Sequence, residues 1–200
     1  MRRRRAALGL AVVALASRAF AGATDPLVPA SVAPAPGVTV PTSFEPWTMT
    51  AATPQAFEAE RIEKGPCDGR LACTEWSIEP TFSFQPDGGQ CAVTTIGVKV
   101  SVRHRLPTWE PSQPLPPSAE TWWRRVLPEI IAHEGGHRDL AVETGNRLMA
   151  ALSALPAEAT CPLLVKRARS EATRLIEEGE QRQRDYDAKT ERAHRRSLWE

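Results

Sequence analysis

The strongest pattern of hydrophobic and polar residues is a strict alternation in the middle of the chain. Its apolar members, each separated from the next by one glycine or polar residue, are Ile96, Val98, Val100 and Val102. A weaker alternation precedes it and includes Trp76, Ile78, Phe82 and Phe84. A period of two places alternate side chains on one face of a strand, so both segments are typical of β-structure. The turn signal Pro86-Asp87-Gly88-Gly89 lies between them, and the pattern predicts a hairpin with arms 80–86 and 90–104.

Beyond a loop with five prolines, at 107–117, the apolar residues recur at helical spacing. Ser118 is the expected N-cap of a helix that runs to about Leu155. Pro128 inside this segment predicts a kink or a restart, because proline lacks a donor and clashes with the preceding turn. Cys161-Pro162 is expected to open a second long helix that ends near residue 190.

These elements predict an α+β fold, in which a small antiparallel sheet is followed by two long helices packed across it. The folded domain is expected to cover residues 49–200. Residues 22–48 contain six prolines, which predict an extended and mobile linker ahead of that domain.

The N-terminus has the pattern of a signal peptide over residues 1–21. Arg2 to Arg5 form a charged segment, Ala6 to Ser17 form an apolar one, and Ala19-Phe20-Ala21 is a small-x-small cleavage signal. The apolar run has 12 residues, fewer than the ~20 that span a bilayer. Cleavage after Ala21 and a secreted or periplasmic location are therefore predicted, by the general or the twin-arginine route.

Charge narrows the choice of partners. The chain has 25 basic and 24 acidic residues, and loss of residues 1–21 with their five arginines leaves 20 basic against 24 acidic, a net charge of −4. A net negative charge does not favour binding to the phosphate backbone of nucleic acid. No later segment is apolar for long enough to span a membrane. A peptide or protein is the expected partner.

Four cysteines in an exported chain predict disulfides, for which three pairings are possible. Cys67 and Cys73 flank a short loop and are expected to close it, which leaves Cys91 to pair with Cys161. The alternative, a four-cysteine zinc site, requires pairs with C-x2-C spacing, and these are absent.

One motif indicates chemistry: His133-Glu134-Gly135-Gly136-His137, an H-E-x-x-H. Spacing of four places both imidazoles on one helix face, where they can bind one zinc ion. Glu134 then lies beside the metal, where a carboxylate can act as general base toward a zinc-activated water.

The alternative interpretation of this motif is a surface helix with scattered polar residues. Gly135 and Gly136 argue against it, because each glycine inside a helix costs ~1 kcal/mol relative to alanine. Two adjacent glycines indicate either the close approach of another backbone or the end of the helix. His104 follows Val98, Val100 and Val102 at a spacing of two, so its side chain is expected on the same apolar face of the strand. This position favours a hydrogen-bonded residue in the core or at its rim over a metal ligand.

The chain also resembles a bacterial family of unknown function that is described as predicted secreted zinc-dependent proteases. The resemblance runs from about Trp47 to His194 and rests on a set of short motifs. They are Gly65-Pro66, Trp76, Gly89-Gln90-Cys91, Leu106-Pro107-x-Trp109, Trp123, the H-E-x-x-H motif, Cys161 and Tyr186-Asp187-x-x-Thr190. The resemblance implies a zincin-like peptidase fold with bound zinc. The family pattern continues with His-Gly, whereas this chain has Arg192-Ala193 there.

The last helix is expected to supply a third zinc ligand, because a catalytic zinc takes three protein ligands and a water. Asp187 is preferred because it occupies the position that matches the family motif. His194 is the alternative, but it lies near the chain end and two positions beyond the family histidine. Asp187 could instead orient a zinc-bound imidazole or be solvated.

These features together predict an exported zinc metallopeptidase with Glu134 as general base. The alternatives are a catalytically inert exported binding domain that retains the zincin-like fold, and a structural module that a metal only stabilises. A peptidase requires a carboxylate at position 134, and the other two classes do not.

Overall fold

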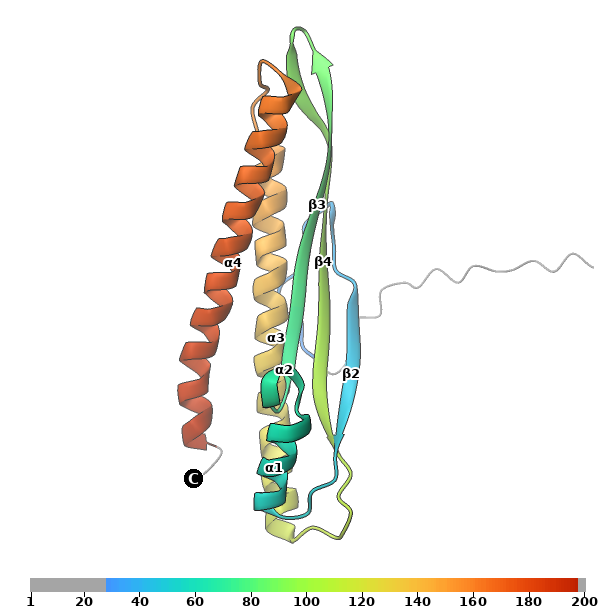
Figure 1. Ribbon diagram of the computed structural model, residues 1–200, viewed down its shortest axis with the longest axis vertical. Helices are drawn as coiled ribbons and strands as arrows, with labels where there is room; N and C mark the ends of the chain where they lie inside the picture. The colour runs from blue at the N-terminus through green and yellow to red at the C-terminus, as the bar shows by residue number, and fades with distance from the viewer. Residues whose placement is uncertain (1–27, 198–200) are drawn as a thin grey trace, which may run out of the picture.

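The computed structural model describes residues 28–197, and the side chains of all of these except residues 54 and 191–197. Two long helices lie side by side along a narrow, elongated sheet (Figure 1). The elements in chain order are β1 (Val38–Thr39), β2 (Thr42–Met49), α1 (Pro54–Lys64), α2 (Pro66–Gly69), β3 (Cys73–Asp87), β4 (Gln90–Trp109), α3 (Pro117–Ser153) and α4 (Cys161–Ser197). The expected signal peptide, residues 1–21, lies outside the described residues.

The predicted hairpin is present and is longer than its alternation suggested. β3 and β4 pair from Cys73 opposite Arg105 to Asp87 opposite Gln90. Gly88 and Gly89 have φ values of 56° and 87°. A two-residue hairpin turn of type I′ requires positive φ at both central residues, and glycine adopts such values without strain. The register shifts by one residue between Ser83 and Phe84, a β-bulge that changes which residues face each other nearer the open end.

The α+β class is confirmed, but the sheet is mixed rather than antiparallel. β1 and β2 run parallel to β4 on the side opposite β3. The expectation that residues 22–48 form a linker is therefore wrong for the part that enters the sheet. Pro46 is compatible with β2 because, in the described part of the chain, this strand pairs on one side only, and an edge strand tolerates a missing donor.

Both predicted long helices are present, with different starts and ends. α3 begins at Pro117 with Pro116 as its N-cap residue, so the expected cap at Ser118 is wrong. Proline fits this first position because its missing N–H would be unpaired there anyway. The helix also continues through Pro128 without a restart. Pro128 is exposed, so water can satisfy the carbonyl that it leaves unpaired. The short helices α1 and α2 were not predicted.

The core lies between one face of the sheet and the two long helices. Val98, Val100 and Val102 are the buried centre of that face. Gly145 of α3 lies against this face, and a Cβ added to it would come within 2.5 Å of Val100 Cγ2. The opposite face is polar, with Arg103 paired to both Glu45 and Glu75 at 3.1 and 2.7 Å. The helices therefore cover only one side of the sheet.

Two disulfides join the pairs expected from the sequence, Cys67–Cys73 and Cys91–Cys161. The second ties the tip of the hairpin to the first residue of α4, where Cys91 also exchanges backbone hydrogen bonds with Glu158 at 2.7 and 2.9 Å. Disulfides suit a compartment outside the cytoplasm. No helix in the described part of the chain is both long and apolar enough to cross a membrane.

We predict that the two disulfides stabilise the fold unequally, because they close loops with sequence separations of 70 and 6. The chain-entropy relation gives about 4 kcal/mol for the long loop and about 2 kcal/mol for the short one. Urea unfolding of Cys91→Ala with Cys161→Ala should therefore show the larger loss, with Cys67→Ala and Cys73→Ala as the matched control. An equal or larger loss in the control pair would contradict this ordering.

Candidate metal centre

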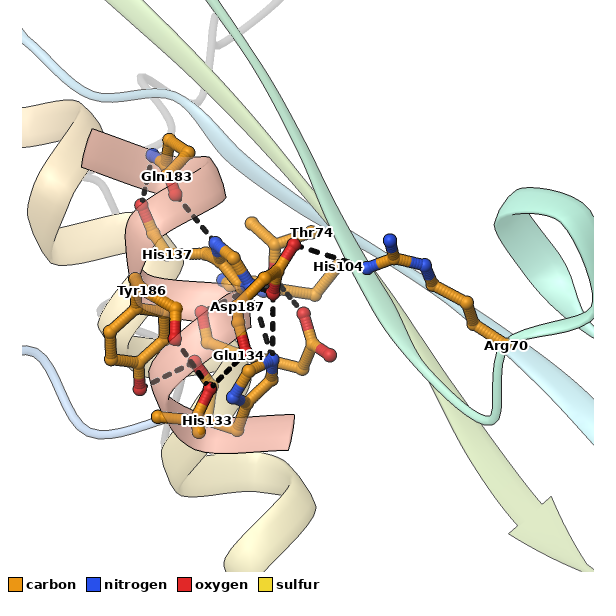
Figure 2. A network of polar contacts seen from close by, with 10 residues as sticks. Arg70, Thr74, His104, His133, Glu134, His137, Gln183, Tyr186 and Asp187 are labelled. Atoms are coloured by element: carbon orange, nitrogen blue, oxygen red, sulfur yellow. Dashed lines mark hydrogen bonds and ion pairs between the residues drawn. The ribbon is translucent and has the colours of Figure 1, made fainter. Parts of the chain in front are cut away.

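The two histidines of the motif lie on the face of α3 that meets α4 (Figure 2). They are one helical turn apart, and their Nε2 atoms are 3.2 Å from each other. Asp187 of α4 reaches the same point: its Oδ1 lies 2.9 Å from Nε2 of His137 and 3.4 Å from Nε2 of His133. Three potential ligand atoms from two helices thus converge on one position.

Gln183, one turn before Asp187 on α4, determines how His137 presents its ring. Nε2 of Gln183 donates to the backbone carbonyl of His137 at 3.0 Å, which turns the amide oxygen toward the ring. That oxygen lies 2.5 Å from Nδ1 of His137 and can only accept, so Nδ1 bears the hydrogen. Nε2 is then left with its lone pair directed at the convergence point, as a metal ligand requires.

The second oxygen of Asp187 faces a different group. Nη1 of Arg70 donates to Oδ2 at 3.4 Å, from the loop that the Cys67–Cys73 disulfide closes. One carboxylate thus divides its oxygens between two imidazoles and one guanidinium. The side chains of His133, His137 and Asp187 are 15%, 9% and 24% exposed, so the three ligand atoms belong to partly buried side chains.

Tyr186 packs against both histidines. Its ring stacks on that of His133 at 5.1 Å and meets that of His137 edge-on at 5.0 Å, and its hydroxyl donates to the carbonyl of His133 at 3.3 Å. Burial raises the pKa of Tyr186, and the carboxylates of Glu134, Asp187 and Asp139 raise it further, so the phenol remains a neutral donor.

The paired glycines of the motif are explained by close contacts on two sides of α3. A Cβ on Gly136 would lie 2.2 Å from the Tyr186 hydroxyl oxygen, and one on Gly135 would lie 2.9 Å from the carbonyl oxygen of Pro29. The helix continues past both, so the expected helix end is wrong. The expected approach of another backbone holds for Gly135, whereas Gly136 is approached by the side chain of Tyr186.

Glu134 points away from α4, toward the sheet, and is only 3% exposed. The hydroxyl of Thr74 on β3 donates to its Oε2 at 2.6 Å. Burial raises the pKa of Glu134 and Asp187 adds to this effect, whereas the Thr74 hydrogen bond, His137 and Arg70 act in the opposite direction. A carboxyl with a raised pKa is better matched to general base work near neutral pH than an ordinary glutamate.

The dimensions of the site fit zinc. Ligand atoms at about 2.0–2.1 Å from a tetrahedral zinc ion are about 3.3–3.4 Å from each other. The three atoms of His133, His137 and Asp187 are separated by 2.9, 3.2 and 3.4 Å. They can form one face of such a tetrahedron and leave the fourth corner for water.

Sequence reasoning selected four residues that the structure brings together: His133, Glu134, His137 and Asp187. The side chain of the alternative ligand, His194, lies outside the described side chains. Five neighbours were not selected as site residues: Arg70, Thr74, His104, Gln183 and Tyr186. Gln183 had a usable signal, because it lies four residues before Asp187 and therefore on the same helix face. Tyr186 had another, because it belongs to the Tyr186-Asp187-x-x-Thr190 motif of the family resemblance.

Two surface hollows in the described structure lie elsewhere. One, of about 420 Å³, adjoins Trp122 near the start of α3, and the other, of about 500 Å³, lies over Arg103 on the polar face of the sheet. Neither of these two hollows is lined by the histidines.

The fold and site define an α+β protein with three potential metal ligands where two long helices meet. Residues 44–195 match the model of a bacterial protein family of unknown function, DUF922. The chain belongs to this family, and the matched span begins in β2 and ends in α4. No curated protein and no solved structure matches the chain.

We predict that Gly136→Ala disturbs the contact between α3 and α4, because its methyl group would overlap the ring of Tyr186. Overpacking of this kind costs about 1–3 kcal/mol. In a Tyr186→Ala background the same change should instead stabilise by up to ~1 kcal/mol, the ordinary preference of a helix for alanine. Urea unfolding of the four proteins in this double-mutant cycle measures the coupling, and an equal effect in both backgrounds would contradict the assigned contact.

Proposed function

We propose that this protein is an exported zinc-dependent peptidase that hydrolyses peptide bonds outside the cytoplasm. The observation that most supports this is the convergence of Nε2 of His133, Nε2 of His137 and Oδ1 of Asp187, at spacings that suit tetrahedral zinc. The two disulfides agree with an exported protein. The signal peptide 1–21 and the peptidase activity are parts of the proposal.

The proposed ligands are His133, His137 and Asp187. When bound, zinc would polarise a water molecule and lower its pKa toward ~7. Gln183 holds the ring of His137 with its lone pair on Nε2, and Arg70 neutralises the oxygen of Asp187 that faces away from the imidazoles. These two residues orient ligands and do not bind the metal themselves.

Glu134 is the proposed general base. It accepts a proton from the water whose oxygen attacks the peptide carbonyl carbon, and it passes that proton to the nitrogen as the carbon–nitrogen bond breaks. Its burial and its place one residue after His133 suit this role, because the carboxyl is adjacent to the ligands without being one of them.

A second candidate is an inert exported domain in which a metal only joins α3 to α4. Two observations favour it. The proposed ligands come from both helices, so a bound ion would act as a staple between them. Arg192-Ala193 also replaces the His-Gly that the family pattern has at this point. The two candidates differ in the role of Glu134, which is the general base in the peptidase and has no catalytic role in the inert domain.

We predict that the mature protein binds about one zinc ion per chain through these three ligands. His133→Ala, His137→Ala and Asp187→Ala should each lose more affinity than the roughly 10–100-fold caused by removing a residue that only orients a ligand. Asp185→Ala changes an exposed carboxylate on the same helix and is the matched control. Competition titration with a chelating dye gives each affinity. A large loss in His194→Ala but not in Asp187→Ala would overturn the assignment.

We predict that Glu134→Gln retains zinc but loses peptide hydrolysis, because the amide keeps the size of the side chain and cannot accept the proton. General base catalysis typically contributes about 10²–10⁴-fold, so kcat should fall by that range at an unchanged zinc content. Glu120→Gln, an exposed carboxylate on α3, is the control. Parent protein with stoichiometric zinc and no hydrolysis of a fluorogenic peptide mixture would favour the inert domain.

A further inference from the structure

Behind Glu134 lies a buried chain of hydrogen bonds that begins in the sheet. Thr74 on β3 and His104 on β4 face each other in the strand register, and the Thr74 hydroxyl oxygen lies 2.8 Å from Nδ1 of His104. The same hydroxyl reaches up to Oε2 of Glu134 at 2.6 Å (Figure 2). His104 is 1% exposed, so it is a core residue, as its strand parity indicates, and it also contacts the site.

The direction of these hydrogen bonds follows from the number of hydrogens. A threonine hydroxyl has one hydrogen to donate, whereas an ionised carboxylate and a backbone carbonyl can only accept. Thr74 lies within reach of Oε2 of Glu134 at 2.6 Å and of its carbonyl oxygen at 3.2 Å, so its hydrogen is directed at Glu134. Nδ1 of His104 must then donate to the Thr74 oxygen, which assigns the imidazole hydrogen to Nδ1.

The imidazole of His104 also packs against an aromatic ring. The ring of His104 stacks on that of Phe44 from β2 at 5.1 Å, so three strands contribute to its support. The hydroxyl of Thr74 donates a short hydrogen bond to the carboxylate of Glu134, at 2.6 Å. The Thr74 hydroxyl therefore links the carboxylate of Glu134 to the imidazole of His104.

We propose that Thr74 and His104 are positioning residues for Glu134. The Nδ1–H of His104 directs the Thr74 hydroxyl, and the hydroxyl holds Oε2, so that Oε1 is the oxygen that receives a proton from the attacking water. The catalytic part of this inference rests on the proposed function, whereas the hydrogen-bond chain does not. A buried histidine that served packing alone would have no required tautomer and no required partner.

The hydrogen-bond chain is tested first in zinc-free protein by nitrogen-15 NMR of labelled histidine. We expect His104 to have its hydrogen on Nδ1. The Nδ1 signal should shift in Thr74→Val, which removes the hydroxyl at nearly constant shape, and should stay in place in Thr74→Ser. A hydrogen on Nε2 only, or an unchanged signal in Thr74→Val, would overturn the proposal.

The effect on Glu134 is tested with zinc-loaded protein and a fluorogenic peptide mixture. Thr74→Val and His104→Leu should lower kcat by roughly 10–100-fold, with KM and zinc affinity within about twofold of the parent because no ligand is touched. Thr74→Ser and His104→Asn should restore most of the rate, since the asparagine amide can place an N–H near the position of Nδ1. An unchanged kcat in Thr74→Val, or a serine variant as slow as the valine variant, would contradict the positioning role.

The two proposals fail separately. If the parent protein binds zinc and hydrolyses no peptide, the proposed function is wrong. The positioning role is then decided by the tautomer and by crystal structures of the parent and Thr74→Val. It holds if the Glu134 carboxylate turns away from its parent orientation in the valine variant, and it is overturned if the carboxylate stays in place.

Discussion

The close contact between α3 and α4 is the constraint on which the rest of this structure depends. One glycine on each helix makes it possible. Gly136 of α3 accommodates the ring of Tyr186, and Gly179 of α4 accommodates Thr144, whose side-chain atoms would lie 2.7–2.8 Å from an added Cβ. A larger side chain at either point would move the helices apart. Because one proposed ligand is on α4 and two are on α3, the spacing of the ligand atoms is set by this contact.

The same geometry gives two nearby carboxyl groups different environments. Asp187 is partly exposed, with one oxygen toward two imidazoles and the other toward a guanidinium. Glu134 is buried against the sheet with one hydroxyl as donor, and its pKa is raised mainly by that burial. Two carboxyl groups whose environments differ in this way can take different roles, one as a ligand and the other as a base.

The sheet supports the site and does more than complete the core. Its helix-facing side brings Thr74 and His104 beneath Glu134, while its other side has a network of exposed ion pairs. Such exposed pairs add little to stability. The covered face therefore supplies the hydrophobic burial, and at one end of it a polar pair supports the motif helix.

Local sequence was enough to predict the hairpin, the two long helices, the disulfide pairs and the candidate residues His133, Glu134 and His137. Alternation, helical spacing and the H-E-x-x-H motif depend only on neighbours along the chain, so these predictions required no knowledge of packing. Asp187 was preferred as a ligand because of the family resemblance. The entry of residues 38–49 into the sheet was missed, because prolines there resemble a linker and parallel pairing with β4 is a contact between distant segments.

Only the tertiary structure decided which residues surround Glu134. If the register of the hairpin tip continued without the bulge near Ser83, Thr74 would pair with Arg103, which belongs to the polar face of the sheet. Because of the bulge, Thr74 pairs with His104 on the face that the helices cover. Arg70 reaches Asp187 across 117 residues of sequence, and Gln183 reaches His137 across 46. The sequence by itself determined which side chains were available for chemistry, because residue type and local periodicity are properties of the chain. Their partners were decided by one inserted strand residue and one close helix contact, which are properties of the packed molecule.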